Sequence, residues 1–397
     1  NAGRNKPVTV TGYTLSGTDA GNYVLVQPTG LSADIARANL AVSGVSAAGK
    51  TYDGTTVATL TGSATVTALT GDVVAVGGTG IGAFADKNAG TGKAVTVTGY
   101  TLSGADAGNY VLVQPAGLSA DIARASLAVS GVSANDKIYD GTAAATLSGT
   151  ATVTALSGDV VALGGTGIGS FADKNAGTNK PVTVTGYTLS GTDAGNYDLV
   201  LPALSADIAR ATLTYTADAV RRTYGAASPA LTGTVTGFVP GESLASAATG
   251  TLAFGTLATA SSNVGTYAIT GSGLSAGNYV FVQAAGNAGA LTIDPAAISI
   301  SGARTYDATT GFTADQITVA GGVNGEILTL TAGSGNAASA DAGTYAGSSL
   351  TGLRLAVAGG NGAAANYRLP DTGTLSITPS PVIVTARSGS SAYGDTP

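Results

Sequence analysis

The feature that most constrains this chain is a tandem repeat. The tripeptide Gly-Asn-Tyr, with one Ala-Asn-Tyr variant, recurs every 82 to 88 residues and ends at Tyr23, Tyr110, Tyr197, Tyr279 and Tyr367. A second marker runs out of phase with the first: Tyr-Asp-Gly-Thr begins at Tyr52 and Tyr139, and altered forms begin at Tyr224, Tyr306 and Tyr393. Because solenoid units are shorter, about 20–50 residues, this period predicts small domains joined in tandem.

The two markers divide the chain into six segments. Four are complete repeats, of which 39–125 and 126–211 are near-copies, whereas 212–295 and 296–379 have diverged. Residues 1–38 correspond to the C-terminal part of a repeat, and residues 380–397 correspond to the opening strand of a further repeat. Because these two pieces together are shorter than one repeat, we expect the sequence to be a window from a longer array.

The local pattern is that of β-strands throughout. Val8-Thr9-Val10-Thr11 alternates apolar and hydroxyl side chains, and the same pattern recurs at residues 95–98 and 182–185. Short alternating runs with turn signals about 8–12 residues apart predict an all-β fold of tandem small antiparallel sandwiches, immunoglobulin-like in type. Short linkers, stiffened by proline at Pro295 and Pro379, favour a semi-rigid rod of such domains.

Divergence between the copies indicates which side chains face inward. The residue after the marker tyrosine varies among Val, Asp and Arg, which predicts a solvent-facing position, while the next residue is always large and apolar. The tyrosine shares the face of that apolar residue, so the marker tyrosines should point into the core. One isoleucine in the last strand of each repeat marks the same face, at Ile35, Ile122, Ile208, Ile293 and Ile377. A change of phase at Gly99 predicts a β-bulge.

Composition excludes several classes of function. The chain has no Cys, His, Met or Trp, so it cannot form a disulfide, a Ser-His-Asp triad, a thiol nucleophile or an ordinary zinc site. Only 10% of residues are charged and the net charge is −6, which leaves no basic footprint for nucleic acid. No apolar run is long enough for a membrane-spanning helix. We therefore expect no enzymatic activity, cofactor or nucleic-acid partner.

Two short motif matches carry little weight. Residues 44–51 match the phosphate-binding loop pattern, but a turn follows them where that loop requires a helix. Residues 273–277 match a nucleophile elbow in a chain without histidine. Lys50 and Lys137 are also candidates for a lysine–asparagine cross-link, but the later repeats have Arg222 and Arg304 at the matching positions. A surface or tyrosine-flanking cation is preferred, so replacing Lys50 with alanine should change stability by less than about 0.5 kcal/mol.

A weak calcium site is the one candidate for metal binding. Asp86 and Asn88, and the matching Asp173 and Asn175, offer oxygen ligands in a short loop. The first carboxylate becomes serine in the later repeats, whereas an Asn or Asp two residues before glycine persists, which is turn chemistry. The turn interpretation is therefore favoured over calcium, and no metal is expected.

Several motifs in combination resemble those of a known repeat family. The series Tyr52–Thr55, Gly71–Val74, Phe84–Gly90 and Leu102–Tyr110 resembles the YDG repeat, and residues 126–211 match equally well. Residues 212–295 resemble the related MBG repeat, and residues 296–379 resemble a divergent YDG unit. The segment 1–38 is then the C-terminal part of a YDG-like repeat.

The resemblance implies a place in long secreted bacterial proteins similar to filamentous haemagglutinin. Such proteins are exported by two-partner secretion and displayed at the cell surface, which implies a stalk or fibre, adhesion and biofilm matrix. The expected partners are neighbouring copies of the chain, along or between fibres, and host or matrix glycans or proteins. A repeat-borne glycan-binding module is the alternative, although most of the tyrosines that would stack on sugars occupy the inward positions.

Overall fold

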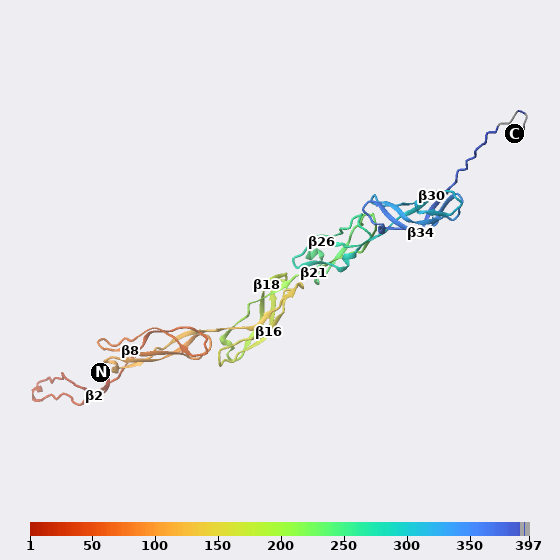
Figure 1. Cartoon of the computed structure of the whole chain (residues 1–397). Coiled ribbons are helices and arrows are strands. Elements are labelled where there is room, and N and C mark those ends of the chain that lie inside the picture. The colour runs from red at the N-terminus through yellow and green to blue at the C-terminus, as the bar shows by residue number, and fades with distance from the viewer. Residues whose placement is uncertain (390–392, 394–397) are drawn as a thin grey trace. The chain divides into compact units, whose positions relative to one another are not determined.

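The computed structural model describes residues 1–389 and 393, and strands hold 54% of the chain. The described part contains a single α-helix, α1 (Leu244–Ala247), so the expected mostly β class is confirmed (Figure 1). The chain forms two compact units, one of residues 1–137, 143–173 and 179–207, the other of residues 138–142, 174–178 and 208 onward. No helix within the described residues has the length and apolar character needed to cross a membrane.

The strands and short 3-10 helices follow the repeats. The partial repeat and the first full repeat contain β1 (Gly3–Val8), η1 (Ala20–Asn22), β2 (Leu31–Ile35), β3 (Ala38–Ala41), β4 (Ser43–Ala47), β5 (Lys50–Thr51), β6 (Val57–Ala58), β7 (Leu60–Thr65), β8 (Ala75–Phe84), β9 (Gly90–Ser103), η2 (Ala107–Asn109), β10 (Tyr110–Val113) and β11 (Leu118–Ala123). The second contains β12 (Ala125–Ala128), β13 (Ser130–Ala134), β14 (Lys137–Ile138), β15 (Ala144–Ala145), β16 (Leu147–Thr152), β17 (Ala162–Phe171), β18 (Gly177–Ser190), η3 (Ala194–Asn196), β19 (Tyr197–Val200) and β20 (Leu204–Ala209).

The divergent repeats differ in strand length and in how their strands group into sheets. The third contains β21 (Ala211–Ala217), β22 (Val220–Thr223), β23 (Gly233–Thr236), α1, β24 (Thr249–Gly255), β25 (Gly265–Tyr267), β26 (Thr270–Ser275), β27 (Tyr279–Gln283), η4 (Ala285–Gly289) and β28 (Leu291–Asp294). The fourth contains β29 (Ala296–Ala297), β30 (Ser299–Thr305), β31 (Gly311–Thr313), η5 (Ala314–Gln316), β32 (Ile317–Ala320), β33 (Ile327–Asn336), β34 (Gly343–Gly359), η6 (Ala364–Asn366), β35 (Tyr367–Arg368) and β36 (Thr372–Thr378).

Each repeat is built on curled sheets of mixed direction. In the first full repeat five strands run in the order β5-β11-β9-β8-β6, and β3 pairs with β10. The pairs β3–β10 and β5–β11 are parallel, because a long connection separates the opening strands from the closing strands. The expected purely antiparallel arrangement is therefore wrong, and the structure gives no support for an immunoglobulin-like sandwich.

The marker tyrosines are buried in all four complete repeats, as the alternation predicted. Tyr110, Tyr197, Tyr279 and Tyr367 are at most 6% exposed. The apolar residue two positions later is only half-buried, as at Leu112. The isoleucines of the last strands are fully buried in the complete repeats.

Buried clusters cross the boundaries between repeats. The cluster around Phe84, Val97 and Ile122 in the first full repeat also contains Leu127 and Tyr197 of the second. Ile298 and Tyr367 of the fourth repeat likewise join the cluster that surrounds Leu291 of the third. Burial of apolar surface therefore stabilises neighbouring repeats together.

The predicted bulge lies where β8 and β9 change register. Gly78 pairs with Tyr100 and Ile81 with Thr98, so β8 has one extra residue at this point. Gly99 has φ +88°, and a Cβ there would lie 2.3 Å from the carbonyl oxygen of Thr79. Only glycine fits that approach.

The two partial segments are less complete than the repeats between them. In residues 1–38 only β1 and β2 pair with each other, and Tyr23 and Ile35 are 72% and 51% exposed. Residues 380–389 form no strand, and the rest of the predicted opening strand, apart from Tyr393, lies outside the described residues.

A matched pair of isoleucines tests the assignment of the core. Ile122 is 1% exposed and Ile81 is 64% exposed in the same sheet. Ile122→Ala should lower the free energy of unfolding by about 2–5 kcal/mol through lost burial and a cavity. Ile81→Ala should change it by less than about 0.5 kcal/mol. Urea unfolding of both variants measures this, and equal losses would contradict the assignment.

Candidate functional site

The calcium candidates are occupied by protein contacts. Asp86 Oδ1 accepts hydrogen bonds from the Asn88 amide and from Lys93 Nζ at 2.6 Å. Asp173 Oδ1 accepts from Lys180 Nζ in the same way, and Asn175 Oδ1 accepts from another repeat. Among the described residues no three acidic side chains gather to hold a metal ion. In both loops the first carboxylate is thus held by a lysine of its own repeat.

Lys50 is a structural cation, which corrects the expectation that it is a dispensable surface residue. Its side chain is only 17% exposed, and Nζ donates to Asp53 Oδ1 at 2.7 Å and to Thr55 at two atoms. Asp53 Oδ1 also accepts from the Thr55 amide and hydroxyl, which closes the Tyr-Asp-Gly-Thr turn. Lys50 thus bridges Asp53 and Thr55 and stabilises this turn.

Neither motif match has the geometry of its mechanism. Residues 44–51 lie on β4 and β5 with no helix after them. Residues 273–277 include the end of β26 and the turn after it. Both are strand and turn segments, as the sequence context indicated.

The structure brings together three residues that sequence analysis did not combine. Each is an acidic residue that follows glycine early in a repeat, in the loop before the long hairpin. We call Asp159, Glu242 and Glu326 the junction carboxylates. Each accepts hydrogen bonds from two tyrosines, one in its own repeat and one in the repeat before it.

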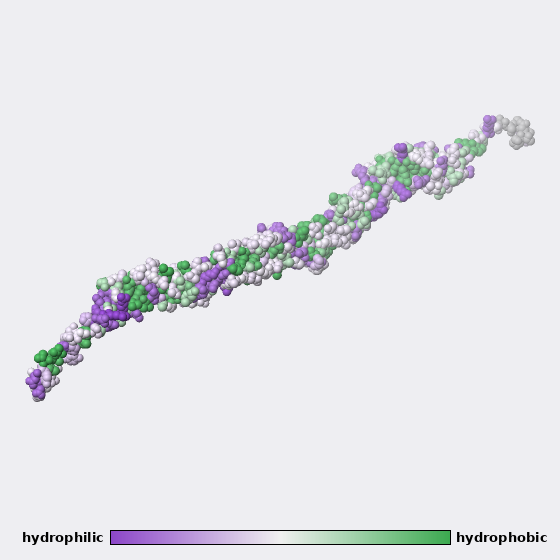
Figure 2. All heavy atoms as spheres, turned by 90° about the horizontal axis from the view of Figure 1, so that it is seen from below, coloured by the Kyte–Doolittle hydropathy of each residue, from purple (hydrophilic) through white to green (hydrophobic). Residues whose placement is uncertain are grey.

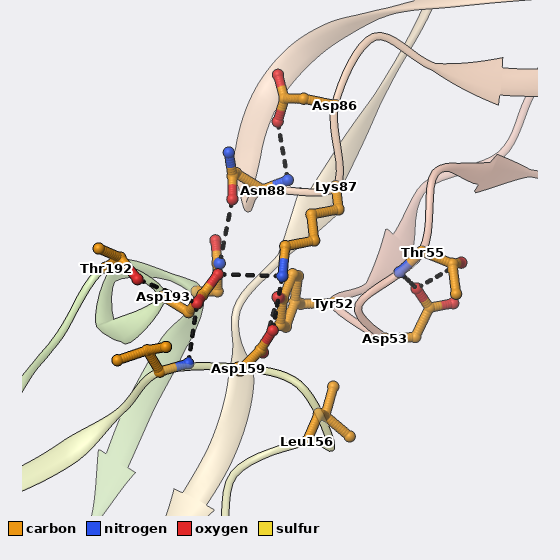
Figure 3. Close-up of polar contacts among 12 residues, drawn as sticks. Tyr52, Asp53, Thr55, Asp86, Lys87, Asn88, Leu156, Asp159, Thr192 and Asp193 are labelled. Carbon is orange, nitrogen blue, oxygen red and sulfur yellow. Dashed lines mark hydrogen bonds and ion pairs between the residues drawn. The ribbon is translucent and has the colours of Figure 1, made fainter.

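In the first junction, Figure 3 labels Tyr52, Lys87, Asp159 and Asp193. Tyr52 of the first full repeat and Tyr197 of the second both donate to Asp159 Oδ2, each at 2.7 Å. Lys87 Nζ donates to Asp159 Oδ1 at 2.6 Å and lies 3.1 Å from Asp193 Oδ1. The Asp159 side chain is 2% exposed, so the charge is enclosed by its partners.

The second junction repeats this geometry with a longer acid. Tyr139 and Lys174 both donate to Glu242 Oε1, while Tyr279 donates to Oε2 at 2.8 Å. These residues all belong to one compact unit, because the loops 138–142 and 174–178 cluster with the third repeat.

The third junction keeps the pair of tyrosines. Tyr224 donates to Glu326 Oε1, and Tyr367 donates to Oε2 at 2.6 Å. Ser262 stands at the position of Lys87, and among the described residues no cation pairs with Glu326, which is 8% exposed. Two hydroxyls therefore satisfy this buried carboxylate.

The two tyrosine rings of each junction also pack against each other. Tyr52 and Tyr197 meet edge to face with their centroids 5.5 Å apart. The other junctions have the same geometry at 5.4 and 5.6 Å. Edge-to-face pairs are worth about 0.5–1.5 kcal/mol beyond the area they bury.

A pair of asparagines closes each junction beside the tyrosines. Asn196, directly before Tyr197, accepts from the Ala89 amide at 2.9 Å and donates to Asn88 Oδ1 at 3.2 Å. Asn278 and Asn366 make equivalent bonds to the repeats before them. This explains why the Gly-Asn-Tyr marker persists, and why Asn88 persists when Asp86 does not.

Glycine in the motif turn permits the close approach of the next repeat. Gly54, Gly141 and Gly225 have φ between +77° and +82°. A Cβ at Gly141 would lie 3.1 Å from Val239, and one at Gly225 would lie 2.7 Å from Val323. Both the Tyr-Asp-Gly and the Tyr-Gly turn therefore present a glycine to the following repeat.

Hydrogen bonds in the junctions lower the pKa of Asp159 and Glu242, whereas burial raises the pKa of the tyrosines. The Tyr139 hydroxyl and the Lys174 ammonium lower the pKa of Glu242 to about 2. Burial opposes ionisation of Asp159, but hydrogen bonds from Lys87 and the two tyrosines hold its pKa below the usual value. Burial beside Glu326 raises the pKa of Tyr367 to about 12. Asp159 and Glu242 are therefore ionised, and the junction tyrosines are protonated, at neutral pH.

The signal for these sites was present in the sequence but not used. Every complete repeat has an acid after glycine, at Asp72, Asp159, Glu242 and Glu326. The two tyrosine markers and this acid are far apart along the chain, so a pattern within one repeat does not reveal that they meet.

Two family models match the chain. The model described as the YDG domain matches residues 1–30, 36–117, 123–206 and 287–374, and the model described as the MBG domain (YGX type) matches residues 213–289. Tandem domains of these kinds are typical of bacterial surface repeat proteins. Both models describe repeat domains, and neither match bears on filamentous haemagglutinin or on an export route. No curated protein matches the chain.

Removing the charge of one junction should destabilise it. Asp159→Asn keeps the shape but replaces an acceptor oxygen with an amide group beside two hydroxyls and an ammonium. The free energy of unfolding of the first unit should fall by about 2–3 kcal/mol. Asp72→Asn is the control, because among the described residues Asp72 accepts from one tyrosine only, and its loss should be smaller. Equal losses in urea unfolding would contradict the junction.

A methyl group at the motif glycine tests the close approach. Gly54→Ala meets only a 3.9 Å contact to Leu156, so it should cost about 1–2 kcal/mol for the positive φ alone. Gly225→Ala adds a clash with Val323 and should cost more. Thermal unfolding of both variants compares them, and an equal or smaller loss for Gly225→Ala would be the contrary result.

Glu242 should contribute to acid sensitivity. Its folded pKa of about 2 lies below the ordinary value of 4.5, so its stabilisation is present above pH 4.5 and is lost as pH falls towards 2. Glu242→Gln should therefore show a flatter decline of melting temperature in this window and a lower value at pH 7. Parallel curves for the variant and the parent would contradict the assignment.

Proposed function

The chain belongs to the YDG domain family, and on that premise we propose that it is a non-catalytic structural segment of the stalk or filament of a bacterial surface adhesin or biofilm-matrix fibre. The observation that carries this proposal is the junction. Three times, a carboxylate of one repeat is bound by a tyrosine of the repeat before it. Such links suit a part whose task is to transmit position and force from one repeat to the next.

The chemistry of the junction favours a semi-rigid rod over a flexible string. Bending at a junction would separate a buried carboxylate from a hydroxyl donor and leave the charge with fewer partners, which is costly. The asparagine pair and the tyrosine edge contact resist the same motion. A row of such links would stiffen the chain without disulfides or metal ions.

An extracellular position at the bacterial cell surface is part of the proposal. Hydroxyl-rich strands with few charges and no cysteine suit export in an unfolded state, as two-partner secretion requires, followed by folding outside the cell. The face in Figure 2 shows pale surface of weakly polar residues with scattered hydrophilic and hydrophobic areas. The proposed partners are neighbouring copies of the chain, along or between fibres.

A glycan-binding module is the second candidate, and one observation favours it. The third repeat has a pocket of about 450 Å³, lined by the hydroxyl-bearing residues Thr256, Ser262, Tyr267 and Thr270 and by Leu257 and two alanines. A pocket that combines hydroxyl-bearing and apolar residues fits a neutral sugar. Binding of the chain to a glycan array, lost in Tyr267→Phe, would support this candidate.

Solution scattering tests the structural proposal. A compact globule of this length has a radius of gyration of roughly 21 Å. A stiff stalk predicts a value far above this, which falls in the double variant Asp159→Asn/Glu242→Gln while circular dichroism keeps its β signal. A value near that of a globule would contradict the stalk. Surface labelling of intact producing cells tests the location separately.

A further inference from the structure

The dipeptide Asn-Gly occurs twice in the sequence, and both copies lie beside the same junction carboxylate. Asn324 and Gly325 directly precede Glu326 in the loop between β32 and β33. Asn361 and Gly362 lie in the loop between β34 and η6, and a Cβ at Gly362 would lie 2.2 Å from Glu326 Oε2. The backbone of the second pair therefore packs against the acid that follows the first pair.

The fold requires both glycines but neither asparagine. Gly325 has φ +77°, and a glycine precedes the junction acid in every complete repeat. Gly362 has no space for a side chain beside the Glu326 carboxylate. The position of Asn324 varies, since the other complete repeats have Thr70, Ser157 and Pro240 there. Asparagine before this glycine is therefore particular to the fourth repeat.

Both pairs are accessible to solvent. The side chains of Asn324 and Asn361 are exposed. In the part of the chain that the structure describes, neither the Gly325 amide nor the Gly362 amide donates a hydrogen bond. Because glycine has no Cβ, its backbone nitrogen can approach the side chain of the preceding asparagine with little steric hindrance.

This arrangement allows a reaction that needs only water. The glycine nitrogen forms a bond to Cγ of the preceding asparagine, and the side-chain nitrogen leaves as ammonia with the proton that the backbone amide loses. Water then adds to either carbonyl of the five-membered imide, and one C–N bond breaks. The product is aspartate, or isoaspartate, in which the main chain runs through the former side chain.

We propose that the third junction is a site of self-modification, at which Asn361 and Asn324 deamidate and thereby loosen the contact between the third and fourth repeats. Asn361 reacts first, because the Glu326 amide donates to the Val323 carbonyl at 3.0 Å and closes the turn that contains Asn324. This proposal goes beyond the structural role, since it concerns how one junction changes with age.

The products would oppose the contacts of this junction. Asn324 Nδ2 donates to the Ala260 carbonyl of the third repeat at 3.4 Å, and a carboxylate in its place has no proton to donate at neutral pH. Each reaction also adds a negative charge near Glu326, with which no cation pairs among the described residues. Lys87 and Lys174 stand beside the acids of the other two junctions. Like charge beside a buried carboxylate is destabilising.

Peptide mass spectrometry of the full chain, incubated at mildly alkaline pH, tests the chemistry. Trypsin places Asn324 in the peptide 305–354 and Asn361 in the peptide 355–368. The same peptides contain Asn336, which precedes alanine, and the buried Asn366, which precedes tyrosine. Asn324 and Asn361 should convert about tenfold faster than these two, with isoaspartate among the products. Conversion at the rate of Asn336 would overturn the proposal.

Hydrogen exchange of single amides measures the effect on the junction. The Val323 amide donates to the Tyr367 hydroxyl at 3.0 Å, and the amides of Leu156 and Val239 make the same bond at the other two junctions. After incubation the Val323 amide should exchange about tenfold faster, while Leu156 and Val239 keep their rates. Conversion of both asparagines with unchanged exchange at Val323 would also overturn the proposal.

A matched variant separates deamidation from other effects of incubation. Asn324→Gln/Asn361→Gln keeps both amide groups, but the longer side chains would have to close a larger, less favourable ring. Each protein is compared with its own fresh sample, so that any strain from the substitutions cancels. The Val323 amide of the variant should keep its rate, and an equal rise in both proteins would contradict the proposal. These readouts are independent of the stiffness and location of the protein, so the proposed stalk stands or fails separately.

Discussion

The hydrogen bonds from two tyrosines to one buried carboxylate are the interaction on which the arrangement of repeats depends. A buried charge is costly unless it is paired, and here its partners come from two different repeats. Tyr52 and Tyr197 satisfy the same oxygen of Asp159, so neither repeat alone can satisfy this acid. Separating the two repeats would leave this buried carboxylate with fewer hydrogen-bond donors, and the pairing therefore holds neighbouring repeats together.

Other features of the sequence follow from this requirement. Gly225 gives its motif turn the space to approach the next repeat, and in the first full repeat Asp53 with Thr55 fixes the shape of the turn. Asn196 aligns the neighbour through an amide pair. Both markers of the repeat therefore lie at the contact between repeats, and the small, weakly polar residues elsewhere build the sheets that position them.

Sequence analysis predicted the parts of this structure that depend on local pattern. Alternation placed Tyr110 and Ile122 inward, and the change of phase at Gly99 located the bulge, because both follow from the two-residue period of a strand. The parallel pairing of β3 with β10 was missed, since strand direction depends on the long connection between them. The role of Lys50 was also missed, because its acceptors are set by the fold of the turn.

The junction carboxylates were beyond a pattern confined to one repeat. Asp159 lies 107 residues from Tyr52 and 38 from Tyr197, and only the stacking of repeats brings the three together. Comparison of the copies would have indicated these residues, because every complete repeat keeps an acid at the position of Asp159, whereas the acid at the position of Asp86 is lost in the later repeats.

A double-mutant cycle between Tyr52 and Asp159 is the most direct test of the central claim. Tyr52→Phe, Asp159→Asn and the double variant are compared with the parent by urea unfolding of the full chain. If one hydrogen bond joins the two repeats, the effects are not additive, and the coupling free energy is about 1–3 kcal/mol. Additive losses would show that the two residues act separately, and would contradict the account.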